Sequence, residues 1–429
     1  MALSWLQIVR LGFVQMALGS IVVLTTSTLN RLMVVELALP AVLPGMLVAL
    51  HYGIQITRPN WGFLSDTGGH RTRFIIGGMA ALGAGALTAS AGIIAFEQSF
   101  AYGLAVSIFA YALIGLGVGA AGTSLLALLA TATEPGRRAA AATITWLMMV
   151  FGIAVTAASV GAFLDPYTPA LLVRIVAVVA LAALLVTTLA IWGIERRVAV
   201  TVAVPERTRF REGLAEVWAE PRARMFTIFV FLSMTAYFMQ ELILEPFAGL
   251  VFGFSPGQST SLSGAQNGGV FLGMVLVGVL ATGFRFGSLR NWVVAGCIGS
   301  AAALTIISLI GQLGVPLLLP AVVLLGVFNG MFAVAAIGAM MALAGEGREK
   351  REGTRMGLWG AAQAIAAGFG GLLGAAAVDA MRAVVSDPSA FSIVFMAEAA
   401  LFLAAAAMAL RIMDRSPERS LPRHLVPGE

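Results

Sequence analysis

Residues 58–73 read RPNWGFLSDTGGHRTR, a short polar stretch between two long apolar stretches of the chain. Its glycines allow the chain to reverse direction in a tight turn, and Arg58, Arg71 and Arg73 place positive charge on both sides of that turn. Arginine and lysine concentrate in the cytoplasmic loops of membrane proteins. The stretch therefore predicts a cytoplasmic turn between two membrane-spanning helices. The same alternation of apolar stretch and short polar break continues on both sides of it.

The composition of the chain is that of a membrane protein. Hydrophobic residues make up 59% of it, charged residues make up 11%, and the mean hydropathy is +0.94, whereas about 25% of the residues of a water-soluble protein are charged. A helix needs roughly 20 apolar residues to cross the hydrocarbon core. We therefore expect an all-α integral membrane protein with twelve transmembrane helices. The expected spans are residues 10–30, 39–58, 73–96, 101–131, 139–163, 169–193, 225–250, 262–283, 290–311, 315–345, 354–380 and 390–412.

Basic residues divide the loops between the two sides of the membrane. Of the 26 lysine and arginine residues, all except Arg31, Arg174 and Arg382 fall on one side of the expected spans. This side is predicted to be cytoplasmic, so both termini and the 194–224 loop are expected there. The sequence pI near 10.0 is also found in nucleic-acid-binding proteins, but topology and contact with anionic headgroups explain the positive charge here. We expect membrane lipids, and no nucleic acid, as partners.

The second half of the chain repeats features of the first half at a distance of about half the chain. The repeated pairs are GFLSD (62–66) with GVLAT (278–282), Trp146 with Trp359, and Asp165 with Asp379. Such repeats predict two pseudo-repeated six-helix bundles. The expected domains are an N-terminal bundle (1–193), a cytoplasmic linker (194–224), a C-terminal bundle (225–412) and a cytoplasmic tail (413–429).

The linker contains an amphipathic pattern. In ERTRFREGLAEVWAEPRAR (206–224), Phe210, Leu214, Val217 and Trp218 recur at helical spacing among charges. This pattern predicts a helix that lies on the membrane surface. Docking of a partner protein is the alternative interpretation.

The loop after the second span carries a sequence motif, GFLSDTGGHR at 62–71. It resembles the loop motif of the major facilitator superfamily, although His70 stands where an arginine is usual and Thr282 replaces the acid in the second-half copy. We expect Asp66 to cap a neighbouring helix or to pair with an arginine such as Arg71. The loop is then either a cytoplasmic gate, closed by contacts made in one state only, or a static turn. The expected gating residues in this loop are Gly62, Asp66, Gly69 and Arg71.

Longer segments point to a narrower family. They are NRLMVVELALPAVLPG (30–45), LHYGIQITRPNWGFLSDTGGHRT (50–72), MQELILEPFAGLVFGFS (239–255) and GLWGAAQAIAAGFGGLLGAAAVD (357–379). These segments resemble the PucC/LhaA family, the bacteriochlorophyll-delivery branch of the major facilitator superfamily in phototrophic bacteria. The resemblance covers both halves of the chain, and the size of the chain suits the shorter members. Gln266 and Asn267 depart from the pattern, because a more apolar stretch is expected there.

The resemblance implies a role in handling (bacterio)chlorophyll as cargo, with carotenoid as a further cargo, and in assembling light-harvesting complexes. The implied partners are antenna or reaction-centre polypeptides and a chlorophyll biosynthetic enzyme, either a synthase or a reductase. The implied location is the bacterial inner membrane, in its intracytoplasmic photosynthetic part. The sequence itself contains no nucleophile–base pair, metal-ligand spacing or nucleotide-binding loop, so we expect no enzymatic activity. A secondary transporter of a small solute or lipid, and a structural partner of the photosynthetic complex, are the alternatives.

Ionisable residues inside the expected spans are functional candidates, because a buried charge is costly in lipid. Glu241 and Glu245 lie in the outer third of the seventh span, and Glu398 lies in the twelfth. We expect Arg31, at the outer end of the first span, to pair with Glu36. A clasp between Arg31 and Glu241 or Glu245, across the two halves, is a second expectation. The interiors of the first and fourth spans contain no acid or arginine, which disfavours proton-driven transport of a polar solute.

Polar side chains in the apolar interior are candidates for holding the pigment. His51 lies at membrane depth, and a neutral imidazole is the usual axial ligand of a pigment magnesium. A hydrogen bond between helices is the alternative role for a lone membrane histidine. The other expected cargo-binding residues, whose amide oxygens offer a further ligand for magnesium, are Gln55, Gln266, Asn267 and Gln363.

Overall fold

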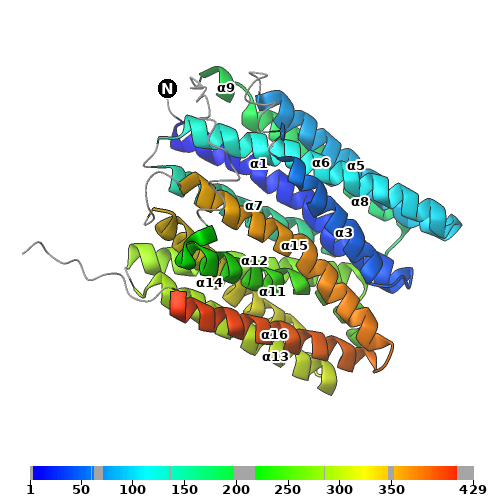
Figure 1. Ribbon diagram of the computed structural model, residues 1–429. Coiled ribbons are helices and arrows are strands. Elements are labelled where there is room, and N and C mark those ends of the chain that lie inside the picture. Colours follow the sequence, from blue (N-terminus) through cyan, green and yellow to red (C-terminus); the bar gives the residue numbers. More distant parts are fainter. Residues whose placement is uncertain are drawn as a thin grey trace, which may run out of the picture.

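The computed structural model describes residues 3–58, 60–61, 71–134, 137–197, 218–284, 286–345 and 352–412. Within these residues the chain is helical and forms no strand (Figure 1). Of the described helices, 11 are long and apolar enough to cross a membrane, and the shorter apolar helix Val42–Thr57 stands at the place of the second span. The expected all-α membrane fold is therefore confirmed.

The first half begins with a continuous helix of 32 residues. Its elements are α1 (Trp5–Val23), the π-helix η1 (Leu24–Thr28), α2 (Leu29–Arg31), the π-helix η2 (Leu32–Glu36), α3 (Val42–Ile54), the 3-10 helix η3 (Gln55–Thr57), α5 (Arg71–Gln98), α6 (Phe100–Ala132), α7 (Arg138–Phe163), α8 (Pro169–Ile191) and α9 (Ile194–Arg197). The first four elements are continuous over Trp5–Glu36, so the first span does not end at residue 30 as expected. No proline interrupts the chain before Pro40, and the helix therefore continues past Arg31.

The second half has the corresponding set of helices. They are α11 (Pro221–Phe252), α12 (Pro256–Val277) with the π-helix η5 (Gly278–Gly283), α13 (Leu289–Leu313), α14 (Leu318–Gly345), α15 (Glu352–Arg382) and α16 (Asp387–Ile412). Gly253 ends α11 in a left-handed conformation (φ 68°), which favours glycine. The predicted amphipathic linker helix lies outside the described residues except at its end, where Trp218 is exposed. The tail 413–429 also lies outside them.

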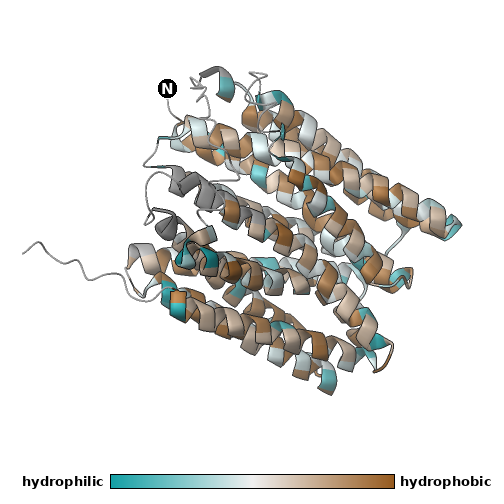
Figure 2. Ribbon diagram, in the orientation of Figure 1, coloured by the Kyte–Doolittle hydropathy of each residue, from teal (hydrophilic) through white to brown (hydrophobic). Residues whose placement is uncertain are grey.

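Each half has a hydrophobic core of its own. One core is built from residues between Leu3 and Ile194, joined by Leu242 of the other half, and the second from residues between Phe226 and Ile412. Apolar residues run along the helices and hydrophilic residues gather at the helix ends (Figure 2). α1 begins and α16 ends at the same end of the molecule (Figure 1). We call this the cytoplasmic end, following the predicted orientation, and the opposite end the outer end.

Two helix pairs make the most extensive contacts between the halves: α7 packs against α12, and α3 packs against α15. Small residues allow helices to approach closely in lipid. A Cβ atom on Gly264 would lie 2.5 Å from the backbone nitrogen of Ala158, and one on Gly368 would lie 3.1 Å from the Cβ of Tyr52. Glycine at these positions therefore brings the two halves together.

Candidate functional site

Two aspartates at the outer end bind helices of the opposite half. Asp379, near the end of α15, accepts hydrogen bonds from the backbone nitrogens of Ala41 (3.0 Å) and Val42 (2.7 Å), where α3 begins. The unpaired N–H groups and the dipole at a helix N-terminus favour a carboxylate there. Asp379 therefore ties the second half to the first.

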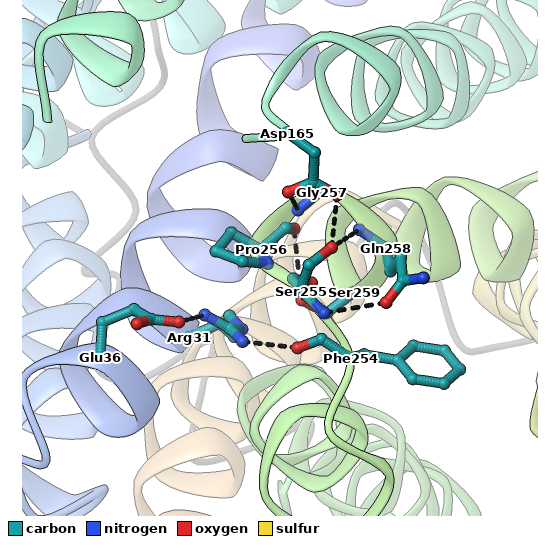
Figure 3. Close-up of polar contacts among 9 residues, drawn as sticks. All are labelled: Arg31, Glu36, Asp165, Phe254, Ser255, Pro256, Gly257, Gln258 and Ser259. Carbon is teal, nitrogen blue, oxygen red and sulfur yellow. Dashed lines mark hydrogen bonds and ion pairs between the residues drawn. The ribbon is translucent and has the colours of Figure 1, made fainter. Parts of the chain in front are cut away.

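Asp165 makes the equivalent contact in the other direction. It follows α7 and accepts hydrogen bonds from the backbone nitrogen of Gly257 (3.0 Å) and from the hydroxyl of Ser255, where α12 begins (Figure 3). The start of α12 is itself capped, because Ser255 and Gln258 form a reciprocal capping box. Asp165 and Asp379, which the sequence marks as a repeated pair, thus form two latches between the halves.

Arg31 lies close to the Asp165 latch (Figure 3) and is almost completely buried. One of its terminal nitrogens forms an ion pair with Glu36, and the other donates a hydrogen bond of 2.7 Å to the carbonyl oxygen of Phe254 in the second half. The expected Arg31–Glu36 pair is present. The π-helical turn explains it, because such a turn brings residues five apart into register.

The expected ion pair between Arg31 and Glu241 or Glu245 is not formed among the described residues, and this expectation is corrected. Arg31 does clasp the second half, but through the backbone oxygen of Phe254. The physical reason is that both terminal nitrogens of the guanidinium already have partners at the outer end. The two acids lie farther along α11, toward the middle of the membrane.

A row of hydroxyl and amide groups continues the interface inward from Arg31. The amide nitrogen of Asn30 donates to the carbonyl oxygen of Leu242 (2.8 Å). The hydroxyls of Thr28 and Thr260 lie 3.2 Å apart, and that of Ser263 donates to Ser27 (3.4 Å). We call these residues of η1, α2 and α12, with the backbone they contact on α11, the polar seam. Ser27 and Thr28 of the seam lie in the π-helix η1, a geometry that often marks functional sites.

Two acids of α11 face the polar seam. Glu241 faces the hydroxyl of Thr26. Glu245 is 1% exposed and faces Ser263 and Arg31. Neither of its carboxylate oxygens has a hydrogen-bond partner in the described structure. They are two of the three intramembrane acids that the sequence singled out, and the fold places these two at the contact between the halves.

His51, Gln55 and Arg58 form a chain of hydrogen bonds along α3 and η3. The guanidinium of Arg58 donates to the amide oxygen of Gln55, whose amide nitrogen lies 3.1 Å from Nε2 of His51. An amide nitrogen can only donate, so His51 Nε2 accepts and the ring proton is on Nδ1. Nδ1 is buried without a partner among the described residues. The free lone pair needed to bind magnesium is therefore used by Gln55 in this arrangement.

The other expected cargo-binding residues lie on two different helices. Gln266 and Asn267 are half-buried on α12, where the amide of Asn267 donates to the carbonyl oxygen of Ser263 (3.0 Å). Gln363 is half-buried on α15. Asn267 thus extends the polar seam inward. The described hydrogen bonds do not link these three residues to His51.

The expected gating loop is described only at its end. Gly62, Asp66 and Gly69 lie outside the described residues. Arg71 begins α5, where its backbone nitrogen donates to Glu195 of α9 (2.7 Å) and its guanidinium donates to the carbonyl oxygen of Ala127 on α6 (3.1 Å). Glu195 also accepts from the backbone of Thr72 (2.9 Å). Glu195 of α9 therefore caps the helix that follows this loop.

Sequence reasoning missed the latches as functional contacts. Asp165 and Asp379 appeared only as markers of the repeat, and nothing local indicates that their partners lie in the opposite half. A partial signal exists at Ser255–Gln258, where serine followed three residues later by glutamine is a readable helix start.

Residues 28–416 match the family described as PUCC protein. The chain belongs to the PucC family. It is 66% identical over 415 residues to the bacteriochlorophyll synthase 44.5 kDa chain of Rhodobacter capsulatus, and the match covers 96% of each chain. It is also 31% identical to Protein PucC of Cereibacter sphaeroides, over 84% of this chain and 81% of that one. The PucC resemblance expected from the four quoted segments is confirmed.

Solved transporters share the fold of this PucC-family chain. A bacterial homologue of the human lysosomal transporter Spinster, in an inward-facing conformation, matches 97% of this chain and 99% of its own with a TM-score of 0.69 and 14% identity. The nucleoside transporter NupG matches 95% and 99% with a TM-score of 0.67 and 13% identity. Identities this low concern the fold alone. The predicted major facilitator architecture is confirmed, and the chain is a multi-pass membrane protein.

Proposed function

We propose that this protein is a non-enzymatic (bacterio)chlorophyll-handling factor of the photosynthetic membrane. It accepts pigment from a biosynthetic enzyme, a chlorophyll synthase or reductase, and delivers it to antenna or reaction-centre polypeptides. The single observation that carries the proposal is the PucC-family match along nearly the whole chain, together with a 66% identical relative named for bacteriochlorophyll. Carotenoid, a second apolar pigment, is proposed as a further cargo.

The name of that relative contains the word synthase, whereas we propose that this chain is not an enzyme. The support is architectural. The fold of a solved transporter matches 97% of the chain. We propose that the chain works beside the enzyme that makes the pigment, in the intracytoplasmic membrane, with both termini in the cytoplasm. The predicted excess of arginine on that side supports the orientation.

A secondary transporter is the second candidate function. The observation that favours it is the likeness to transporters in both halves. Fold is a weak guide to cargo, because the same architecture serves many substrates. The two candidates differ in what copurifies with the protein, so one experiment distinguishes them.

The test is gentle purification of the tagged, full-length protein from a phototrophic host, followed by an absorption spectrum and identification of bound proteins. We expect pigment in a fixed ratio to protein and a biosynthetic enzyme or antenna polypeptide among the partners. A tagged membrane protein of unrelated function from the same host gives the level of adventitious pigment. Pigment no higher than that level, with uptake of a solute by reconstituted vesicles, would establish the transporter instead.

A substitution at His51 tests how the pigment is held. His51→Leu is expected to leave the pigment-to-protein ratio unchanged within about twofold, because Gln55 already uses the lone pair of Nε2. It is expected to lower stability by about 1–3 kcal/mol, because the Gln55 amide loses its buried acceptor. Pigment content and thermal unfolding are measured on the same sample. Gln55→Leu is the matched control, and loss of pigment in folded His51→Leu, but not in Gln55→Leu, would assign the magnesium ligand to His51.

A further inference from the structure

Glu245 of α11 is a buried acid at the contact between the two halves. Its side chain is 1% exposed, and neither oxygen has a hydrogen-bond partner in the described structure. It faces the hydroxyl of Ser263 on α12 and the guanidinium of Arg31. The acid therefore lies in the polar seam, where the halves meet, and not inside the core of one bundle.

The positive charge near Glu245 is engaged elsewhere. Arg31 forms its ion pair with Glu36 and donates its other terminal nitrogen to Phe254. Its charge is therefore already balanced by a carboxylate. The helix α11 also carries Glu241. This second acid faces Thr26, Tyr52 and Tyr237, none of which carries a positive charge.

The helices packed around α11 supply no other counter-charge in the described structure. Between Pro256 and Val277, α12 has no titratable side chain. On α15, Asp379 is bound to the start of α3 and Arg382 pairs with Asp387 of α16. Glu398 of α16 is another buried acid, packed in the core of the second bundle. Glu245 in ionised form would thus face only one positive charge, that of Arg31, which is already paired with Glu36.

An ionised carboxylate without a partner is costly to bury. A metal cation has no ligand set here, because the described residues contain no group of three or more His, Cys, Asp or Glu side chains that could hold one. A proton neutralises the acid without adding a charge. We propose that Glu245 is a proton-binding site whose neutral form seals the outer interface between the two halves.

The site couples proton binding to separation of the halves. When the outer ends part, water reaches Glu245, and the carboxyl group releases its proton to water and becomes a carboxylate (COOH → COO⁻ + H⁺). The outer-closed state therefore holds one proton more than the outer-open state. Acid favours the closed state and alkali favours the open state. This inference does not depend on pigment as cargo, so it can fail or hold separately from the proposed function.

The test measures the separation of the outer ends of the full-length protein in nanodiscs at different pH values. Cys297, the single cysteine, is replaced by alanine, and spin labels are attached at Ala170→Cys of α8 and Leu313→Cys of α13, two exposed residues at the outer end. Pulsed electron paramagnetic resonance spectroscopy gives the distribution of distances between the two labels at pH values between about 5 and 9. We expect a short distance at acid pH. As the pH rises, the ratio of the long-distance to the short-distance population should increase by up to about tenfold per pH unit.

Two glutamine variants decide the assignment. Glu245→Gln, which mimics the neutral acid, is expected to keep the short distance at every pH. Glu398→Gln is the matched control, an equally buried acid away from the interface, and it is expected to respond to pH like the parent. The proposal is overturned if the labelled protein without a glutamine substitution shows no pH response, or if its distances follow sodium concentration and not pH. It is also overturned if the pH response persists in Glu245→Gln or is lost in Glu398→Gln.

Discussion

Replacing Asp379 with alanine is expected to move the protein toward a state with its outer ends apart. The substitution removes the carboxylate that accepts hydrogen bonds from the backbone nitrogens of Ala41 and Val42. The loss of even one hydrogen bond to a charged group costs about 1.5–3 kcal/mol, so the ratio of closed to open protein should fall at least about ten- to a hundredfold. The Ala170–Leu313 label pair measures this ratio, and its labels lie on helices that do not carry the mutated contact.

The matched control is Asp387→Ala at the same end of the molecule. Asp387 pairs with Arg382 inside the second half (2.9 Å), so its loss should leave the distance between the halves unchanged. Asp165→Ala should act like Asp379→Ala, and the two effects should add in free energy because the latches share no partner. Equal effects of Asp379→Ala and Asp387→Ala would show that the latch does not hold the halves together.

The two latches illustrate what the sequence can and cannot reveal. Their symmetry is visible in the chain, because Asp165 and Asp379 recur at the same point of each half. Their partners are invisible, because each aspartate binds the helix start of the opposite half, far away in sequence. Sequence repeats report that two halves are alike. How the halves face each other is a property of the assembled fold.

The class of fold was predictable for a simple physical reason. Lipid requires an apolar surface along every spanning helix whatever its neighbours are, so hydropathy locates the spans without knowledge of packing. The first span shows where this reasoning fails. Arg31 was read as its boundary, yet the helix continues to Glu36, because the buried guanidinium is paired there and needs no water. A charge marks the end of a span only when it has no partner.

Arg31→Glu is expected to destabilise the protein strongly. The substitution places a carboxylate beside Glu36 and removes the hydrogen bond to the carbonyl oxygen of Phe254. Breaking a buried ion pair typically costs about 3–5 kcal/mol, and the added repulsion increases this cost. We expect a clear drop in the thermal unfolding temperature and in the yield of folded protein. Both are measured on detergent-solubilised protein against the parent.

A charge swap identifies the partner of Arg31. Arg31→Glu combined with Glu36→Arg restores an ion pair of opposite polarity and should recover part of the lost stability. Recovery should stay incomplete, because the side chain at position 36 is 40% exposed and replaces neither the burial of Arg31 nor its bond to Phe254. Arg31→Glu combined with Glu241→Arg or Glu245→Arg should give no rescue, since these acids do not pair with Arg31 in the folded protein. Rescue by either of them, and not by Glu36→Arg, would mean that the clasp between the halves is an ion pair deeper in the membrane.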